Sequence, residues 1–278
     1  MTLLYILLAL VVVALVVLVV VFYLKKKKAK AAADRPGDTA APGGDEISLL
    51  VRAAEAKLSA SKIEHGAKIG DLPVYVLMGE SGGAKTSVML HCGLDPELLA
   101  GQVYRNAEVA PTPAANLWFS RRSIFAEAGG KLLADSGQWN RFVRAMKPRS
   151  SVFRKGGQAP RAAVVCLDCE AFTRAGAQEA LANGARTLRA RLGEISQALG
   201  INLPVYVLFT KMDRLPFFTE YVRNLSDDEA TQVIGVTLPL FAGRAEGVYA
   251  EEETARLSGS FERLFRSLAD ARPEFLTR

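Results

Sequence analysis

The segment from Gly79 to Ser87 contains the residue types that bind phosphate groups. It reads GESGGAKTS and follows the phosphate-loop pattern G-x-x-x-x-G-K-[ST], except that Ala84 stands at the second glycine position. In this pattern backbone N–H groups surround a phosphate, the lysine binds the β- and γ-phosphates, and the threonine hydroxyl binds Mg²⁺. Lys85 and Thr86 supply these two side chains. The predicted nucleotide-binding residues of the loop are Gly79, Glu80, Ser81, Gly82, Gly83, Ala84, Lys85, Thr86 and Ser87.

Ala84 is the departure from the pattern that bears most directly on nucleotide binding. Its methyl group is tolerated where the backbone dihedral φ is negative, although it can crowd the close approach of the backbone to a phosphate. Two interpretations of the segment therefore stay open. It is either a phosphate loop or a glycine-rich turn between a strand and a helix.

A second candidate motif, TKMD, lies at residues 210–213. In guanine-nucleotide proteins the aspartate of an [NT]-K-x-D segment accepts hydrogen bonds from the guanine N1–H and N2–H₂ groups, and the lysine stem covers the base. Thr210, Lys211 and Asp213 therefore predict that GTP binds better than ATP. A solvated loop is the alternative interpretation.

Between the two motifs, Glu127-Ala128-Gly129-Gly130 stands where such proteins have D-x-x-G. The aspartate of that motif holds the Mg²⁺ hydration shell, and the glycine N–H meets the γ-phosphate. A glutamate keeps the charge but is one methylene longer, so the metal geometry has to adjust. We predict Thr86, Glu127 and Thr112 as the metal residues and Gly130 as a phosphate residue. An ordinary surface glutamate before a Gly-Gly turn is the alternative for Glu127.

The sequence offers little for hydrolysis. A hydrolysing GTPase places a Gln or His that orients water just after its D-x-x-G, whereas Lys131 follows here. Arg105, Arg121 and Arg122 are available as arginine fingers, although an arginine on a loop is more often a solvated charge. We predict slow hydrolysis and assign no catalytic residue. Glu127→Asp is expected to raise the rate by restoring the shorter reach.

The elements that must position these motifs follow an α/β pattern. Apolar runs of strand length occur at 72–78, 123–126, 162–167 and 203–209, and runs apolar on both faces are typical of a buried parallel sheet. Residues 176–199 have helical periodicity and form a crossover between the last two runs. A hairpin of 116–120 with 123–126 adds an antiparallel edge. The predicted fold class is α/β, a small-GTPase-like P-loop NTPase whose mostly parallel sheet has helices on both faces.

The composition excludes several classes of protein. Three cysteines and two histidines supply neither a disulfide framework nor a His-rich metal site, and Cys166 and Cys169 are interpreted as buried structural residues. The net charge of +6 comes largely from five lysines in residues 25–30, which leaves 30 basic and 29 acidic side chains in the remainder. We therefore predict no nucleic-acid partner.

The N-terminal run Leu3–Leu24 has 22 residues without a charge, proline or glycine. As a helix it would be about 33 Å long, enough to span a bilayer. The lysines that follow predict that residues 25–278 are cytoplasmic. The predicted segments are a transmembrane anchor at 1–24, a basic flank and flexible linker at 25–45, a linker helix at 46–69, a GTPase-like P-loop domain at 70–245 and a C-terminal helical segment at 246–278.

The order of these motifs resembles a known family. The anchor, the phosphate loop, NLWF at 116–119, EAGG at 127–130, LPVYVLFTKMD at 203–213 and QVIG at 232–235 resemble the N-terminal part of the IcmF/TssM inner-membrane subunit of type VI secretion systems. The resemblance covers about residues 70–245. It implies a scaffold subunit at the bacterial inner membrane, with the membrane subunits TssL and TssJ and the baseplate as partners. It also implies that Lys85, Thr86, Lys211, Asp213, Glu127 and Gly130 take the family's motif positions.

Two other functions remain possible at this point. One is a membrane-anchored GTPase enzyme that acts as a switch in protein targeting, and the other is a degenerate domain that binds no nucleotide. The expected cofactor is GTP or ATP with Mg²⁺. Formation of a homo-oligomer stays open.

Overall fold

The computed structural model describes residues 44–61, 67–105, 108–109, 112–148, 158–238 and 249–277. The chain divides into two units, Met1–Glu46 and Ile47–Arg278. Helix α2 (Gly44–Ala60) contains the boundary between them. The second unit carries the whole of the sheet and its helices.

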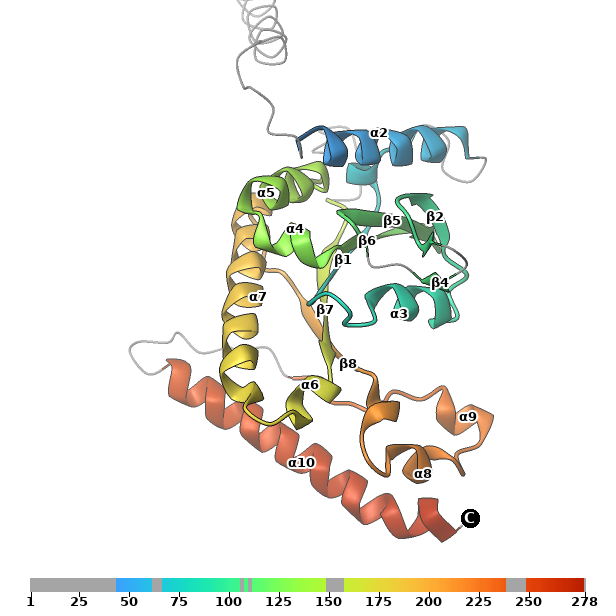
Figure 1. Cartoon of the computed structure of the whole chain (residues 1–278), viewed down its shortest axis with the longest axis vertical. Helices are drawn as coiled ribbons and strands as arrows, with labels where there is room; N and C mark the ends of the chain where they lie inside the picture. The colour runs from blue at the N-terminus through green and yellow to red at the C-terminus, as the bar shows by residue number, and fades with distance from the viewer. Residues whose placement is uncertain are drawn as a thin grey trace, which may run out of the picture. The chain divides into compact units, whose positions relative to one another are not determined.

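A six-stranded sheet forms the centre of the second unit (Figure 1). The parallel strands are β1 (Val74–Met78), β6 (Ser123–Ala128), β7 (Arg161–Asp168) and β8 (Val205–Thr210). Strand β5 (Ala115–Ser120) pairs antiparallel with β6, and β2 (Glu97–Ala100) pairs antiparallel with β5. The order across the sheet is β2-β5-β6-β1-β7-β8, and β3 (Tyr104–Arg105) and β4 (Glu108–Val109) form a separate pair. The predicted hairpin and its antiparallel edge are therefore confirmed.

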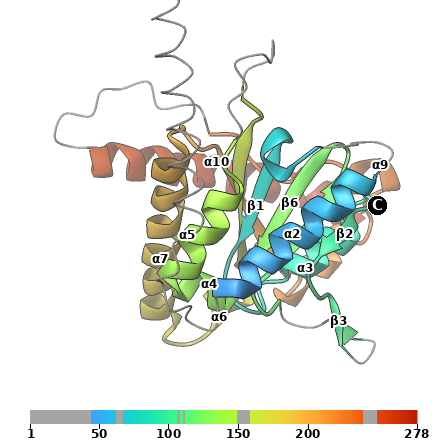
Figure 2. The same cartoon turned by 90° about the horizontal axis from the view of Figure 1, so that it is seen from above.

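Helices cover both faces of the sheet, and the alternation along β1 shows why. Val74, Val76 and Met78 pack into the larger core with α2, α4 (Gly130–Ala134), α5 (Ser136–Ala145) and α7 (Ala177–Leu199). Tyr75 and Leu77 point to the other face, where they pack with α3 (Lys85–His91). Figure 2 shows the sheet between these helices. Because neighbouring residues of a strand face opposite ways, the fully apolar strand predicted here is buried on both sides.

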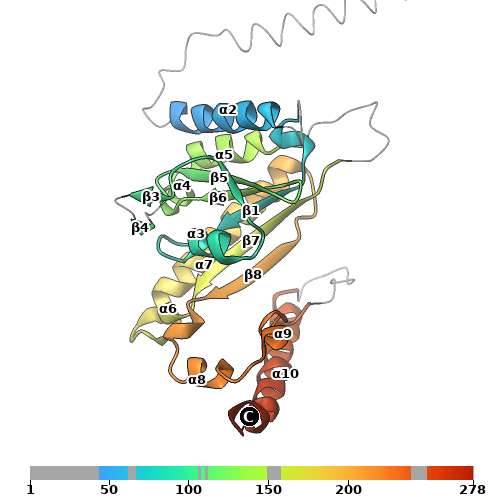
Figure 3. The same ribbon diagram turned by 90° about the vertical axis from the view of Figure 1, so that its right-hand side faces the viewer.

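The remaining elements are short except for the last helix. They are η1 (Ile69–Asp71), α6 (Glu170–Thr173), η2 (Met212–Arg214), α8 (Phe218–Val222), α9 (Asp227–Ala230) and α10 (Tyr249–Thr277). Figure 3 shows α8, α9 and α10 beyond the β8 edge of the sheet. Tyr221 Oη of α8 donates to the Leu268 carbonyl of α10 at 2.8 Å. The Phe209 and Phe261 rings lie 6.3 Å apart, so α10 also contacts β8.

Strand β8 differs from its prediction. The strand exists, but residues 205–209 are 39 % to 58 % exposed, whereas their apolar sequence predicted a strand buried on both faces. The physical reason is its place in the sheet, because β8 pairs with β7 on one side and is the last strand on the other side among the described residues. Apolar periodicity identifies a strand but does not show whether the strand is central or at an edge.

Arg161 at the start of β7 is a buried cation that the sequence analysis did not single out. Its guanidinium donates to five backbone carbonyls at 2.8 to 3.2 Å, those of Met146, Leu72, Ala159, Pro160 and Gly70. Burial lowers the pKa of Arg161 to about 10, although the charge of Asp71 acts in the opposite direction. This one side chain therefore joins the end of α5, the η1 segment and the chain before β7.

The prediction that a transmembrane helix precedes the domain needs correction. In the part of the chain that the structure describes, no helix is both long and apolar enough to cross a membrane. The fold class is accordingly mixed α/β with a six-stranded sheet. The run 3–24 and the following residues up to 43, where the anchor and most of the linker were predicted, lie outside the described residues.

Candidate functional site

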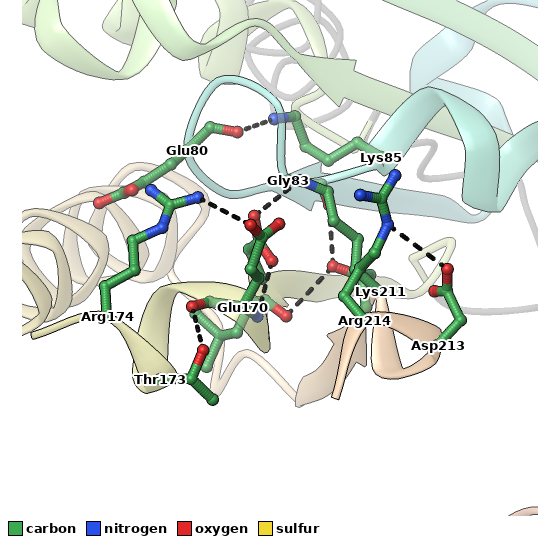
Figure 4. A network of polar contacts seen from close by, with 12 residues as sticks. Glu80, Gly83, Lys85, Glu170, Thr173, Arg174, Lys211, Asp213 and Arg214 are labelled. Carbon is green, nitrogen blue, oxygen red and sulfur yellow. Dashed lines mark hydrogen bonds and ion pairs between the residues drawn. The ribbon is translucent and has the colours of Figure 1, made fainter. Parts of the chain in front are cut away.

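The predicted motifs lie together at the C-terminal ends of the parallel strands. Strands β1, β6, β7 and β8 are parallel, so the segments that follow them emerge on the same side. These segments are the loop 79–84, the Gly129–Gly130 turn, the turn at Asp168–Glu170 and the segment 211–214. Figure 4 shows the loop with Glu80 and Lys85 close to Glu170 of α6, to Arg174 directly after α6, and to Lys211.

Glycine is required at the start of the loop. Gly79 has a φ of 150°, and a Cβ atom built on it would lie 2.3 Å from the carbonyl oxygen of Cys166 on β7. Real side chains do not fit at that distance, so the first glycine of the pattern is set by the close approach of two strands. Ala84 has a φ of 58°, in the left-handed region that disfavours a side chain. The condition under which its methyl group is tolerated, a negative φ, is therefore not met.

Lys85 is turned toward its own loop. Its Nζ donates to the carbonyls of Gly79 at 2.9 Å and Glu80 at 2.7 Å. Burial lowers the pKa of the Lys85 ammonium, and the charge of Glu127 partly offsets that effect. A phosphate would have to replace these carbonyl contacts. Helix α3 begins at Lys85, so this ammonium lies at the N-terminus of the helix and supplies a full positive charge there.

The predicted metal residues Thr86, Thr112 and Glu127 lie together beside the loop. Glu127 has no exposed surface, so the alternative of an ordinary surface glutamate is wrong. Its Oε1 accepts hydrogen bonds from Thr86 Oγ1 at 2.5 Å and from Thr112 Oγ1 at 2.8 Å, and the two hydroxyl oxygens are 3.4 Å apart. A carboxylate and two hydroxyls supply the oxygen ligands that Mg²⁺ prefers. In the described part of the chain no three His, Cys, Asp or Glu side chains gather as an alternative metal site.

Two further members of this cluster, Asn116 and Trp118, come from β5 and were not assigned a role from the sequence. Asn116 Nδ2 and Trp118 Nε1 donate to Glu127 Oε2 at 3.0 and 3.1 Å. The signal that could have found them is the hairpin itself. In its register Asn116 lies opposite Glu127, and Trp118 follows on the same face.

On the other side of the loop 79–84, the TKMD segment contacts both this loop and β7. Thr210 Oγ1 donates to the Gly83 carbonyl at 3.2 Å. Lys211 Nζ forms an ion pair with Asp168 Oδ2 at 2.7 Å, and Asp168 is another residue that the sequence did not reveal. Burial acts to raise the pKa of Asp168, but the hydrogen bond from Lys211 and the remaining contacts outweigh it and lower the pKa. Thr210 and Lys211 thus hold the candidate base-binding segment against the loop.

Asp213 lies outside that network. Its side chain is 72 % exposed and its Oδ2 is 3.6 Å from Arg214 Nε, an exposed pair that contributes little to stability. The carboxylate is therefore accessible to the hydrogen-bond donors of a base.

Gly130 and the arginines of the hairpin lie at opposite ends of the sheet. A Cβ atom on Gly130 would come within 2.9 Å of Ser81 N, so the glycine allows α4 to begin against the loop 79–84. Because β6 pairs with β1 so that Ile124 is beside Val74, the turn Arg121–Arg122 lies at the end of the sheet away from the loop. These two arginines cannot serve as arginine fingers within the chain, which corrects that interpretation. The Arg105 side chain lies outside the described residues.

Ala84→Gly is expected to raise the free energy of unfolding by about 0.5–1 kcal/mol. A residue with a side chain loses about 1–2 kcal/mol of stability in the left-handed backbone conformation, and glycine avoids this loss. The greater conformational entropy of glycine in the unfolded chain cancels about 0.5–1 kcal/mol of that gain in stability. Urea denaturation measures the change. Ala56→Gly in the exposed part of α2 is the matched control and is expected to lower stability. An equal loss in both variants would contradict the strain at Ala84.

The cysteines of the C-x-x-C sequence are free and buried, which agrees with their structural interpretation. Burial raises the pKa of Cys166 to about 11 and also raises the pKa of Cys169. Since the thiolate is the reactive form, we expect iodoacetamide to alkylate only the exposed Cys92 near neutral pH. Mass spectrometry gives the number of modified thiols, and unfolding in urea is expected to expose all three. Rapid alkylation of Cys166 in the folded protein would contradict the burial.

A hollow of about 260 Å³ lies away from this site, between α2, β2 and β5. Its lining residues are Lys57, Leu58, Ala60, Ser61, Glu97, Leu99 and Phe119. Lys57 pairs with Glu97 at 2.8 Å and donates to the Leu98 carbonyl at 2.7 Å. The charged groups there are already matched to each other, so the convergent polar groups at the loop 79–87 remain the candidate site.

Comparison with known proteins adds two findings. The model of the family described as IcmF-related N-terminal domain matches residues 134–278, just over half of the chain. The chain is 30 % identical over 216 residues to the type VI secretion system component TssM1 of Pseudomonas aeruginosa, which covers 74 % of this chain and 18 % of that protein. The chain thus spans less than a fifth of the length of this relative. The matched family region contains the TKMD segment and begins after the loop 79–84 and Glu127.

Proposed function

The chain belongs to the IcmF-related family, and we propose that it is a scaffold component of a bacterial type VI protein secretion system whose α/β domain binds GTP or ATP with Mg²⁺. The family membership supports the first part of the proposal. The second part rests on the cluster beside the predicted phosphate loop. There the buried carboxylate of Glu127 accepts hydrogen bonds from the hydroxyls of Thr86 and Thr112.

The polar groups of the loop can be assigned separate tasks. Lys85 would exchange the carbonyls of Gly79 and Glu80 for phosphate oxygens, which places its positive charge on the phosphates. Thr86, Thr112 and Glu127 would hold Mg²⁺, whose charge offsets that of the phosphates when it is bound. Gly130 lets α4 approach the loop at Ser81, and its N–H would serve as a donor to the phosphate.

Base recognition is assigned to the segment after β8. Thr210 holds the segment against Gly83, and Lys211 is fixed by Asp168. Asp213 is left to accept the two guanine donors, and we therefore propose that GTP is preferred. Asp213→Asn is expected to reduce the preference for GTP over ATP, because it weakens charge-assisted hydrogen bonds of about 1.5–3 kcal/mol each.

A scaffold role is favoured over a turnover enzyme by what surrounds Glu127. The segment directly after it is Ala128, Gly129, Gly130 and Lys131, with no side chain suited to orient water. Arg121 and Arg122 lie at the far end of the sheet. A bound nucleotide would then bias the conformation of the domain rather than be consumed rapidly. A position at the bacterial inner membrane, with TssL, TssJ and the baseplate as partners, completes the proposal.

Isothermal titration calorimetry of the full chain with GTP, GDP and ATP, each with Mg²⁺ and with a chelator, tests nucleotide binding. We expect GTP to bind more tightly than ATP and Mg²⁺ to strengthen both interactions. Lys85→Ala is expected to weaken all of them, whereas the matched control Lys131→Ala, an exposed lysine of α4, changes none. Absence of any nucleotide binding would overturn the nucleotide part of the proposal and favour the degenerate domain.

A further inference from the structure

We infer that Asn116 and Trp118 are positioning residues for the metal ion, since they fix the rotation of the Glu127 carboxylate from behind. This inference rests on the proposed binding of Mg²⁺ with a nucleotide. It assigns a role to the β5 strand of the hairpin, which contributes no residue of the phosphate-loop or base motifs.

The two oxygens of Glu127 have different partners. Oε1 accepts from Thr86 and Thr112, the two hydroxyls assigned to the metal. Oε2 accepts from Asn116 Nδ2 and Trp118 Nε1, both on β5. One oxygen therefore faces the candidate metal position, and the other is held by the neighbouring strand.

Glutamate needs this arrangement more than aspartate does. Its side chain has one more rotatable bond, so the same carboxylate can reach more positions and loses more rotational freedom when it is ordered. Glu127 is also fully buried, and a buried carboxylate is costly unless donors satisfy both oxygens. The donors on Oε2 meet both requirements, because they satisfy that oxygen and prevent the group from turning.

The hairpin supplies these donors with little freedom of its own. Asn116 lies directly opposite Glu127 in the antiparallel register, and Trp118 lies opposite Phe125 on the same face. Asn116 Oδ1 accepts from Gln102 N at 2.9 Å, which fixes the amide so that its Nδ2 points to Glu127. The indole of Trp118 is buried in the small core with Leu77, Met89 and Val103.

Trp139 offers a matched comparison, since the chain has two tryptophans. Both are buried, but Trp139 is on α5 beside Phe142, and its Nε1 has no hydrogen-bond partner among the described residues. A substitution of tryptophan by phenylalanine therefore removes the same ring atoms at two buried positions. Only at position 118 does it also remove a hydrogen bond to Glu127.

The experiment compares GTP affinity with Mg²⁺ and with a chelator in Trp118→Phe, Trp139→Phe and the unchanged chain. We expect Trp118→Phe to reduce the strengthening by Mg²⁺ by about 10–100-fold, the usual effect of losing a residue that orients a metal ligand, with affinity in chelator almost unchanged. Trp139→Phe is expected to keep the full strengthening. An equal loss of affinity in both conditions for Trp118→Phe, or the same loss in both variants, would show a purely structural role and overturn the inference.

Asn116→Asp is the second variant, which keeps the acceptor for Gln102 N and replaces the donor by a second carboxylate. We expect it to reduce the strengthening by Mg²⁺ at least as much as Trp118→Phe, because like charges would face each other. Unchanged strengthening in this variant overturns the inference. If the unchanged chain binds GTP without any effect of Mg²⁺, the inference fails and nucleotide binding stands. If it binds no GTP at all, both fail.

Discussion

Replacing Glu127 with glutamine is expected to abolish the Mg²⁺ dependence of nucleotide binding and to lower the free energy of unfolding by about 1–3 kcal/mol. The carboxylate accepts hydrogen bonds from Thr86, Thr112, Asn116 and Trp118. A glutamine amide has one oxygen, so its NH₂ group either faces Asn116 and Trp118, which then have no acceptor, or faces the hydroxyls of Thr86 and Thr112, which must turn round to accept from it. The loss of negative charge would also remove the anionic ligand that we propose for Mg²⁺.

Calorimetry with and without Mg²⁺, together with urea denaturation, measures both effects. Glu179→Gln is the matched control, because Glu179 is exposed in the first turn of α7 and is not part of the cluster. Surface substitutions of this kind change stability by about 0.5 kcal/mol or less. A Glu127→Gln chain as stable as the control, with its Mg²⁺ response intact, would mean that the carboxylate neither organises the cluster nor binds the metal.

The contacts of Glu127 add a second expectation for Glu127→Asp. From the sequence, the shorter side chain was expected to raise the hydrolysis rate. Since Thr86 and Asn116 contact opposite oxygens of Glu127, a carboxylate drawn back by one methylene loses contacts on at least one side. We now expect Glu127→Asp to weaken the Mg²⁺ response.

The features that could be predicted from the sequence are those set by local pattern. Apolar runs identify β1, β7 and β8, and the helical periodicity of 176–199 identifies α7, because burial repeats at the period of each element. Each predicted motif comes at the end of an apolar strand, namely the phosphate-loop pattern at 79–87, EAGG at 127–130 and TKMD at 210–213. Because the loops after parallel strands all emerge at the same end of the sheet, the sequence could predict that Lys85, Glu127 and Thr210 lie at that end.

The features that could not be predicted depend on distant partners. The exposure of β8 follows from the absence of a strand on its far side within the described sheet, which no local pattern records. The donors Asn116 and Trp118 can be placed only once the hairpin register is known. The sign of φ at Ala84 depends on how the loop closes onto β7. Arg161 was overlooked because its partners are backbone carbonyls, which any sequence could supply.

Arg161→Met is expected to lower the free energy of unfolding by at least about 3 kcal/mol. The Pro160 carbonyl keeps Val74 N as a donor, and each of the other carbonyls left without a donor costs about 1–3 kcal/mol. The five carbonyls come from four separate places, namely Gly70, Leu72, Met146 and the pair Ala159–Pro160. Methionine can fill the volume of the stem but donates nothing. Urea denaturation measures the loss, and Arg144→Met, at an exposed position of α5, is the control expected to change stability by about 0.5 kcal/mol or less.

The pH dependence of this loss provides a further check. Burial lowers the folded pKa of Arg161 to about 10, below its ordinary value, so Arg161 keeps its proton in both the folded and the unfolded chain until the pH approaches 10. Above that pH the unfolded chain holds more protons at Arg161, and its contribution to stability rises with pH. Between about pH 6 and pH 9 the difference between Arg161→Met and the unchanged chain should therefore stay constant. A difference that disappears within this range would show that another titrating group, rather than the guanidinium and its carbonyls, holds these segments together.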